Sequence, residues 1–260
     1  MNLLYFLFTL PLLIFVYVIF GNYILQLTGS EEFAMDFIPG LKIFAVPLIS
    51  YIPQILHAPL VIISLICYGP ATMGATFVYR NFAREEHAWV SDFFSKGLAN
   101  FRQGVIFGII DVALSISLVS TAIGGLMVDV EGDMMILSVA IKSLARIGLV
   151  VYAFARQYIF LQAVTIKLNV FQIIMNSLRF VLLGFWRNAI AVIADAAVIA
   201  VLILLYTPVT LLSLPFLFYS MSGFVAIFTV YPVVKKYIVD PIAAIEAENE
   251  ENSETEEQPN

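Results

Sequence analysis

Residues 104–128 read GVIFGIIDVALSISLVSTAIGGLMV, and this stretch decides the class of fold. It contains a single charged side chain, Asp111. A helix rises about 1.5 Å per residue, so about 20 apolar residues cross the ~30 Å hydrocarbon core of a bilayer. The stretch is therefore long enough and apolar enough to form a membrane-spanning helix.

Five further blocks share this length and composition. The six predicted spans are residues 3–28, 55–79, 104–128, 135–157, 188–206 and 209–232. The chain of 260 residues is 61% hydrophobic and 12% charged, with a mean hydropathy of +0.95, which lies outside the range of soluble domains. We predict an all-α polytopic transmembrane helix bundle of about six spans, which occupies residues 1–240 and has the lipid bilayer as its partner and solvent.

Basic residues between the spans predict the orientation, because short loops rich in Lys and Arg stay in the cytoplasm. Such residues gather in segments 80–102 and 156–187, and Lys235 follows the sixth block. The alternate loops are acidic or uncharged, with Glu31 in one and Asp129 in another. We therefore expect a multi-pass protein of the cell membrane with both termini in the cytoplasm.

Residues 241–260 form an acidic tail with seven glutamates. Its composition is too polar to bury a core, so we predict a solvated, disordered strip. The rest of the chain then holds 12 acidic residues, from a total of 19, against 13 basic ones. The net charge of −6 thus comes from the tail and indicates no cationic partner. The basic segments are accounted for by topology, so no nucleic-acid partner is expected.

Four charged residues fall inside the apolar blocks and form a candidate intramembrane polar network. They are Asp111, Lys142, Arg146 and Asp195. Facing lipid would cost each about 2.5–3.5 kcal/mol on insertion scales, so each should face protein or water. Helical spacing places Asp111 on one stripe with Gly104 and Gly108, which favours close helix contact. The network is either a polar pathway for a solute or a structural ion-pair network, and the sequence leaves both open.

The second block contains Gly69 and Pro70. Pro70 cannot donate an intrahelical hydrogen bond, which predicts a kinked or broken helix. Broken helices at membrane depth are tolerated where they pack in protein or line a cavity, as in transporters. An ordinary kinked span gives the same pattern, so both interpretations stay open.

Segment 80–103 is predicted to be amphipathic and cytoplasmic. Phe82, Trp89 and Phe93 recur in it at helical spacing, with charges between them. This pattern is typical of an interfacial helix or of a docking surface for a partner protein.

The chain contains no recognised catalytic or metal-binding motif. Neither a P-loop, a G-x-G-x-x-G, a G-x-S-x-G nor a Cys/His metal spacing is present. Glu85, Glu86 and His87 lack the spacing of metal ligands, and we expect them to pair locally with Arg84. We therefore predict a protein without enzymatic activity, cofactor or metal.

Three short sequence motifs, which follow one another along the chain, resemble those of a known family. Gly69-Pro70-Ala71-Thr72 is followed by Tyr79-Arg80-Asn81-Phe82-Ala83-Arg84-Glu85-Glu86-His87 and then by Ser91-Asp92-Phe93. The run resembles the YesL-like family of small bacterial multi-span membrane proteins, whose domain is of unknown function. The resemblance is clearest over residues 66–105. Since such proteins are often encoded beside sugar-uptake systems, it implies an accessory role in carbohydrate transport, and it implies no catalytic residue.

Three functions compete. The leading hypothesis is a non-enzymatic accessory component of solute uptake, with carbohydrate as the solute that the resemblance implies, working with transport-system subunits or as a homo-oligomer. Its docking face would be the surface from Arg80 to Arg102. The second is a free-standing secondary transporter that uses the intramembrane charges. The third is a membrane enzyme, for which the sequence offers no motif.

Overall fold

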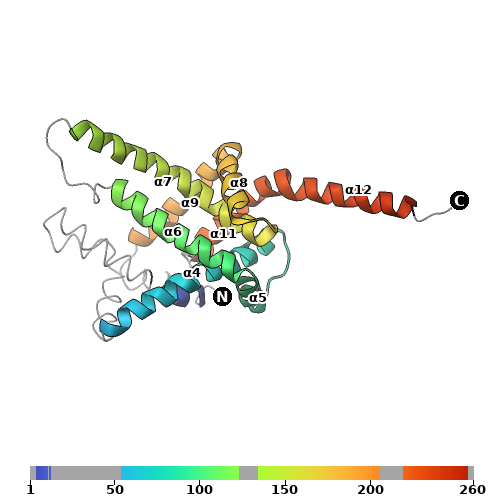
Figure 1. Cartoon of the computed structure of the whole chain (residues 1–260), viewed down its shortest axis with the longest axis horizontal. Helices are drawn as coiled ribbons and strands as arrows, with labels where there is room; N and C mark the ends of the chain where they lie inside the picture. The colour runs from blue at the N-terminus through green and yellow to red at the C-terminus, as the bar shows by residue number, and fades with distance from the viewer. Residues whose placement is uncertain (1–3, 11, 13–53, 123–133, 205–218, 257–260) are drawn as a thin grey trace.

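The computed structural model describes residues 4–10, 12, 54–122, 134–204 and 219–256. These residues form helices and no strand, which confirms the all-α class for the part of the chain described. Figure 1 shows the helices and their labels. In chain order they are the N-terminal helix (residues 4–10), α4 Gln54–Ala83, α5 Val90–Ala99, α6 Phe101–Ala122, α7 Met134–Thr165, α8 Val170–Leu183, α9 Phe185–Leu204, α11 Tyr219–Val234, the π-helical turn η2 Lys235–Val239 and α12 Asp240–Glu256.

Within the described residues, four stretches are long and apolar enough to cross a membrane. They are Pro59–Ala83, Phe101–Ala122, Met135–Thr165 and Met221–Asn249. A fifth span results if α8 and α9, which meet at an angle of 93°, are counted as one bent span. Most of the predicted span 3–28, and the first part of the span 209–232, lie outside the described residues, so the count of six remains a prediction.

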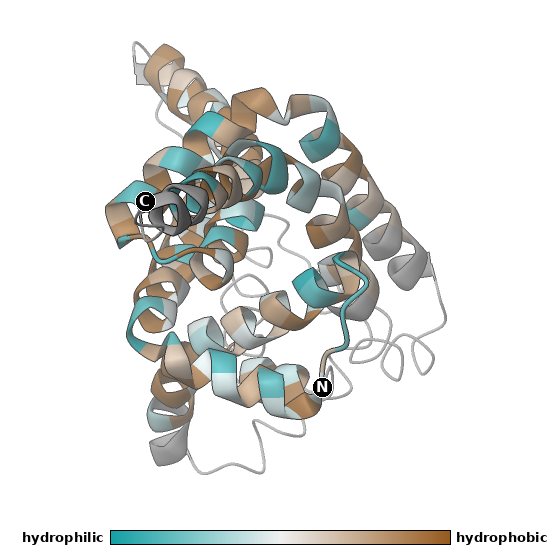
Figure 2. Cartoon of the chain, turned by 90° about the vertical axis from the view of Figure 1, so that its right-hand side faces the viewer, coloured by the Kyte–Doolittle hydropathy of each residue, from teal (hydrophilic) through white to brown (hydrophobic). Residues whose placement is uncertain are grey.

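Apolar residues run along the spans (Figure 2), and many of their side chains are exposed on the outer faces. Ile136 is 80% exposed, and Leu144 and Ile193 are exposed to a similar degree. A continuous apolar exterior is unfavourable in water, whereas lipid tails solvate it readily. The outer surface therefore fits a protein that is embedded in a membrane.

Helices α4 and α6 cross in direct backbone contact. A Cβ atom built on Gly69 would overlap the carbonyl oxygen of Gly104, and one built on Gly108 would lie 2.8 Å from the nitrogen of Gly69. Gly104, Gly108 and Asp111 are all buried, so the predicted small and polar stripe of α6 does face another helix. Close contact of this kind is how helices associate in lipid, where the hydrophobic effect gives no driving force.

Helix α5 folds back along α4 through a second pair of glycines. A Cβ on Gly97 would lie 2.8 Å from the carbonyl oxygen of Pro70, and one on Gly74 would overlap the carbonyl oxygen of Phe93. Phe93 is buried in this contact. Pro70 does not break α4, which continues from Gln54 to Ala83.

The same order of elements occurs twice. A long helix (α4 or α7) is followed by a short amphipathic helix (α5 or α8), a break of one residue (Asn100 or Gly184) and a further helix (α6 or α9). Each short helix begins with a side-chain cap. The Trp89 amide donates to Asp92 at 2.8 Å before α5, and the Gln172 amide donates to Asn169 at 2.9 Å before α8. These caps start each short helix at a fixed residue, as capping boxes do.

The acidic tail, predicted from the sequence to be a disordered strip from residue 241, is helical as far as Glu256. Helix α12 spans Asp240–Glu256 and projects away from the bundle (Figure 1). Its residues 240–249 are exposed, so the expected lack of core packing holds for them. Ala and Glu are strong helix formers. Because α12 continues directly from η2, it does not require a separate helix nucleation step. A segment can therefore be too polar to pack and still be helical.

The substitution Gly69→Ala tests the α4–α6 contact. Its Cβ has no room against the backbone of α6, and overpacking costs about 1–3 kcal/mol even where side chains can adjust. We expect a lower thermal midpoint in detergent and less monodisperse protein on gel filtration. Gly148→Ala is the matched control, because its Cβ would lie 3.2 Å from the flexible end of Leu118. Equal midpoints for the two variants would contradict the contact.

Candidate functional site

A buried carboxylate joins three helices inside the membrane-spanning part of the bundle. Asp111 of α6 accepts hydrogen bonds from Arg156 Nε at 2.8 Å (Oδ1) and 3.0 Å (Oδ2). The hydroxyl of Tyr68 on α4 donates to Oδ2 at 2.5 Å, and that of Tyr152 on α7 donates to Oδ1 at 2.5 Å. Arg156 Nη2 in turn donates to the Tyr68 oxygen at 2.7 Å. We call these four residues the Asp111 cluster.

The position of Arg156 follows from the register of two antiparallel helices. Arg146 Nε donates to the carbonyl oxygen of Ala122, at the far end of α6, at 3.2 Å. Asp111 lies eleven residues before Ala122, and Arg156 lies ten residues after Arg146. The two helices therefore bring Arg156 level with Asp111. Tyr152 lies four residues before Arg156 and so shares its face of α7.

The electrostatics of the cluster make it a strong link between the helices. In a medium of low dielectric a lone charge is costly, whereas an ion pair with its hydrogen bonds filled is tolerated. The Asp111 carboxylate receives donors from Arg156, Tyr68 and Tyr152, which use most of its lone pairs. The Arg156 guanidinium also lies 5.7 Å from the ring centroid of Phe160. Removal of either charged partner would leave the other buried and unpaired.

A cavity of about 310 Å³, with apolar walls that also carry several polar side chains, adjoins the cluster between the N-terminal helix, α4, α7 and α11. The side chain of Arg156 is 39% exposed and that of Asp111 only 4%, so the guanidinium is the charged group that faces the cavity. Other polar side chains line the walls. They include Tyr5, Thr72, Thr76, Tyr79, Gln157 and Ser222.

Two polar atoms at the cavity have no protein partner among the described residues. Oε1 of Gln157 is buried and accepts no hydrogen bond. Arg156 bonds through Nε and Nη2, and its Nη1 makes no hydrogen bond to the described part of the chain. The hydroxyls of Tyr5 and Thr72, by contrast, bond to each other at 3.0 Å. Arg156 thus offers a strong donor to a bound molecule, whereas the Gln157 oxygen is buried in the cavity wall.

The predicted four-charge network is divided by the structure. Asp111 lies in the cluster, but its cationic partner is Arg156 instead of Arg146 or Lys142. Arg146 bonds to Ala122, and Lys142 lies about 21 Å along α7 from Arg156 at the helical rise. Asp195 of α9 interacts with Ser222 of the cavity wall, and its Oδ1 is buried without a hydrogen-bond partner in the described residues.

Sequence reasoning missed Arg156, Tyr68 and Tyr152. The predicted fourth span ends at residue 157, so Arg156 falls in its last turn and counts among the basic residues that set the orientation. Helix α7 in fact continues to Thr165, which places Arg156 well inside it. The spacing of Tyr152 and Arg156 on one helical face was the available signal.

The residues of the family-like run shape the end of α4. Arg80 is buried and its Nη1 donates to the carbonyl oxygen of Val164 at 3.1 Å, near the end of α7, where carbonyls lack helical donors. Its Nη2 donates to Asn81 Oδ1 at 2.9 Å, and its guanidinium lies 4.4 Å from the Phe77 ring centroid. Arg80 therefore fixes α4 to α7 and is not part of an open docking face.

The turn between α4 and α5 uses the next residues of the run. The amide of Glu86 donates to the Asn81 carbonyl oxygen at 2.9 Å, and Arg84 pairs with Glu86 at 2.7 Å. Glu85 adopts a positive φ of 59°. His87 is exposed, and the described residues contain no group of three His, Cys, Asp or Glu side chains that would hold a metal ion. With Gly69, Pro70, Asp92 and Phe93 in the contacts given above, most of the run has a packing, capping or turn-forming role.

Comparisons of the chain with models of protein families, with curated proteins and with solved structures found no match. The resemblance to the YesL-like family therefore remains a prediction from the sequence.

The Asp111–Arg156 pair is tested by a double-mutant cycle. Arg156→Gln leaves a buried carboxylate without its cation, which typically costs about 3–5 kcal/mol. The combined variant Asp111→Asn with Arg156→Gln removes both charges, so we expect a loss of stability smaller than the sum of the single losses. The measurement is the thermal midpoint in one detergent.

Arg146→Gln serves as the matched control, because Arg146 is exposed and, among the described residues, bonds to the end of α6. The pairing would be contradicted if this control lowered the thermal midpoint as much as Arg156→Gln does. It would also be contradicted if the losses of the two single variants added up in the double variant.

Proposed function

We propose that the chain is a six-span protein of the bacterial cell membrane, with both termini in the cytoplasm, that holds a small polar solute during its uptake. The observation that carries the proposal is the polar cavity beside Arg156. Tyr68 lies nine residues inside one candidate span and Arg156 nine residues before the end of another, about 14 Å from each end. Polar groups at this depth are unfavourable against lipid, and a cavity that admits water or solute removes that cost.

The size of the cavity supports a small ligand. A volume of about 310 Å³ equals roughly ten waters at ~30 Å³ each, and it lies at the lower end of the ~300–1,000 Å³ typical of ligand pockets. Tyrosine rings and mixed donors and acceptors line it, and Asp111 offsets the charge of Arg156. These properties suit an uncharged molecule rich in hydroxyl groups, which agrees with the carbohydrate class that the resemblance implies.

The cavity favours direct contact with the solute over a purely accessory role. The docking face proposed from Arg80 to Arg102 is weakened, because Arg80 is buried and Arg84 is paired with Glu86. The sequence contains no P-loop, so we infer that a gradient or a partner subunit supplies the energy for uptake. The non-enzymatic character of the protein is part of the same proposal.

Thiol labelling in proteoliposomes tests the cavity even while the solute is unidentified. In a Cys67→Ala background, Thr76→Cys places one thiol on the cavity wall. We expect a charged, water-soluble methanethiosulfonate reagent to modify this thiol, and a panel of mono- and disaccharides to include one that slows the reaction. Ile109→Cys is the control, because Ile109 is exposed on the outside of α6 and should react poorly in lipid.

The two parts of the proposal fail separately. If Thr76→Cys reacts no faster than Ile109→Cys, the cavity is closed to water and the solute site is excluded. If Thr76→Cys reacts but no sugar protects it, the carbohydrate class is excluded while the open cavity stands.

A further inference from the structure

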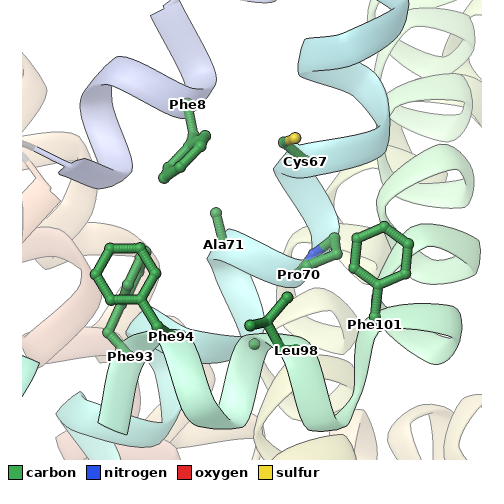
Figure 3. A pocket seen from close by; sticks show the side chains of 9 residues that line it. Phe8, Cys67, Pro70, Ala71, Phe93, Phe94, Leu98 and Phe101 are labelled. Atoms are coloured by element: carbon green, nitrogen blue, oxygen red, sulfur yellow. The ribbon is translucent and has the colours of Figure 1, made fainter. Parts of the chain in front are cut away.

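A second hollow differs in its chemistry from the cavity beside Arg156, which we call the solute cavity after the function proposed for it. It has a volume of about 110 Å³ and lies where the N-terminal helix, α4, α5 and the start of α6 meet. Figure 3 shows Phe8, Ala71, Phe94, Leu98 and other side chains around one shared space. We call this hollow the apolar groove.

The lining of the groove excludes a polar occupant. Its side chains come from Phe, Leu, Ala, Pro, Gly and a single Cys67. A water molecule needs two to four polar partners to enter a buried site, and these side chains offer none apart from the weakly polar thiol. The groove is therefore suited to a hydrocarbon chain.

The shape of the surrounding surface also suits a linear chain. Val90, Phe94, Leu98 and Phe101 recur three or four residues apart, so they lie along one face of α5 that continues into the start of α6. All four are exposed, and the last three line the groove. Because α4 and α6 are candidate spans, the medium outside this face is the bilayer. The acyl chains of lipids are therefore the apolar molecules that surround the groove and could enter it.

The charges near the groove favour an anionic headgroup. Arg102 follows Phe101 directly, is exposed, and makes no ion pair or hydrogen bond to the described residues. Lys96 on α5 lies over the Phe77 ring at 5.0 Å. Asp92, the one acidic residue of α5, accepts the amide hydrogen of Trp89 and caps the helix. Each basic group near a membrane surface raises the binding constant for anionic lipids about fivefold.

We propose that the apolar groove binds one acyl chain of an anionic phospholipid, whose headgroup phosphate pairs with Arg102. The site is separate from the solute cavity, and the proposal does not depend on the function assigned to that cavity. The lipid would complete the contact of α5 with the N-terminal helix and α4.

Quenching of a tryptophan in the groove tests the site. The chain has two tryptophans, so Trp89→Phe and Trp186→Phe remove the background and Phe101→Trp places one reporter in the groove. The full chain is reconstituted in phosphatidylcholine vesicles that contain brominated phosphatidylglycerol or, separately, brominated phosphatidylcholine. We expect the anionic lipid to bind near the reporter about fivefold more tightly than the neutral one.

The charge contribution is tested in the same vesicles. Arg102→Gln should bring the ratio of the two binding constants close to one. Arg179→Gln should leave it unchanged, because Arg179 lies on α8 and bonds to Asn176. Equal quenching by the two lipids in the parent protein, or a ratio that Arg102→Gln does not change, would overturn the proposal.

Native mass spectrometry gives a second measurement that needs no reporter. The unsubstituted chain, extracted from phosphatidylglycerol-containing membranes, should retain bound phosphatidylglycerol. Leu98→Trp fills the groove and should abolish the retention, whereas Leu182→Trp on the exposed side of α8 should not. Retention that is equal in the two variants would exclude the groove as the lipid site.

Discussion

The ion pair between Asp111 and Arg156 is the interaction on which the rest of the bundle depends. Both charges lie well inside helices that are long enough to cross a membrane, where neither would be stable alone. Their pairing fixes α6 against α7, and the hydroxyl of Tyr68 adds α4 to the same point. The geometry of three spans is therefore tied to a few polar atoms, while the apolar surfaces around them pack with little directional preference.

The glycine contacts make this meeting of helices possible. Gly69 and Gly104 bring the backbones of α4 and α6 together one residue away from Tyr68 and less than two turns from Asp111. A larger side chain at either glycine would separate the helices and move the Tyr68 hydroxyl out of reach of the carboxylate. Close packing and polar pairing are thus two parts of one arrangement, and each requires the other.

The arrangement also explains why the cavity beside Arg156 is polar on one side. Asp111 holds Nε of Arg156, and Tyr68 holds Nη2, so the remaining nitrogen is left on the cavity wall beside Gln157. The Asp111 carboxylate neutralises the charge of Arg156 on the side away from the cavity. The cavity therefore keeps a directed donor without a net attraction for anions. A neighbouring face of α4 lines the apolar groove, whose residues offer a ligand mainly dispersion contacts. Helix α4 and the N-terminal helix therefore line both hollows, and only the larger one carries charged and hydroxyl groups.

The sequence was sufficient for the helical class and for the approximate position of the described spans, because apolar length is a strong signal in membrane proteins. It also placed Asp111 on a small-residue face with Gly104 and Gly108. It did not give the partner of Asp111, since pairing depends on the register of α6 against α7, and that register depends on where each helix ends. The run from Arg80 to Asp92 was recognisable as a motif, but only the structure shows that its side chains cap helices and form a turn.

Electron cryomicroscopy of the full chain in a lipid nanodisc, resolved to side chains, would test the central claim most directly. The account predicts that the Arg156 guanidinium lies within hydrogen-bonding distance of the Asp111 carboxylate, with the Tyr68 and Tyr152 hydroxyls on the same carboxylate. It would be contradicted by a map in which Arg156 extends towards the membrane surface and Asp111 pairs with Arg146 or Lys142.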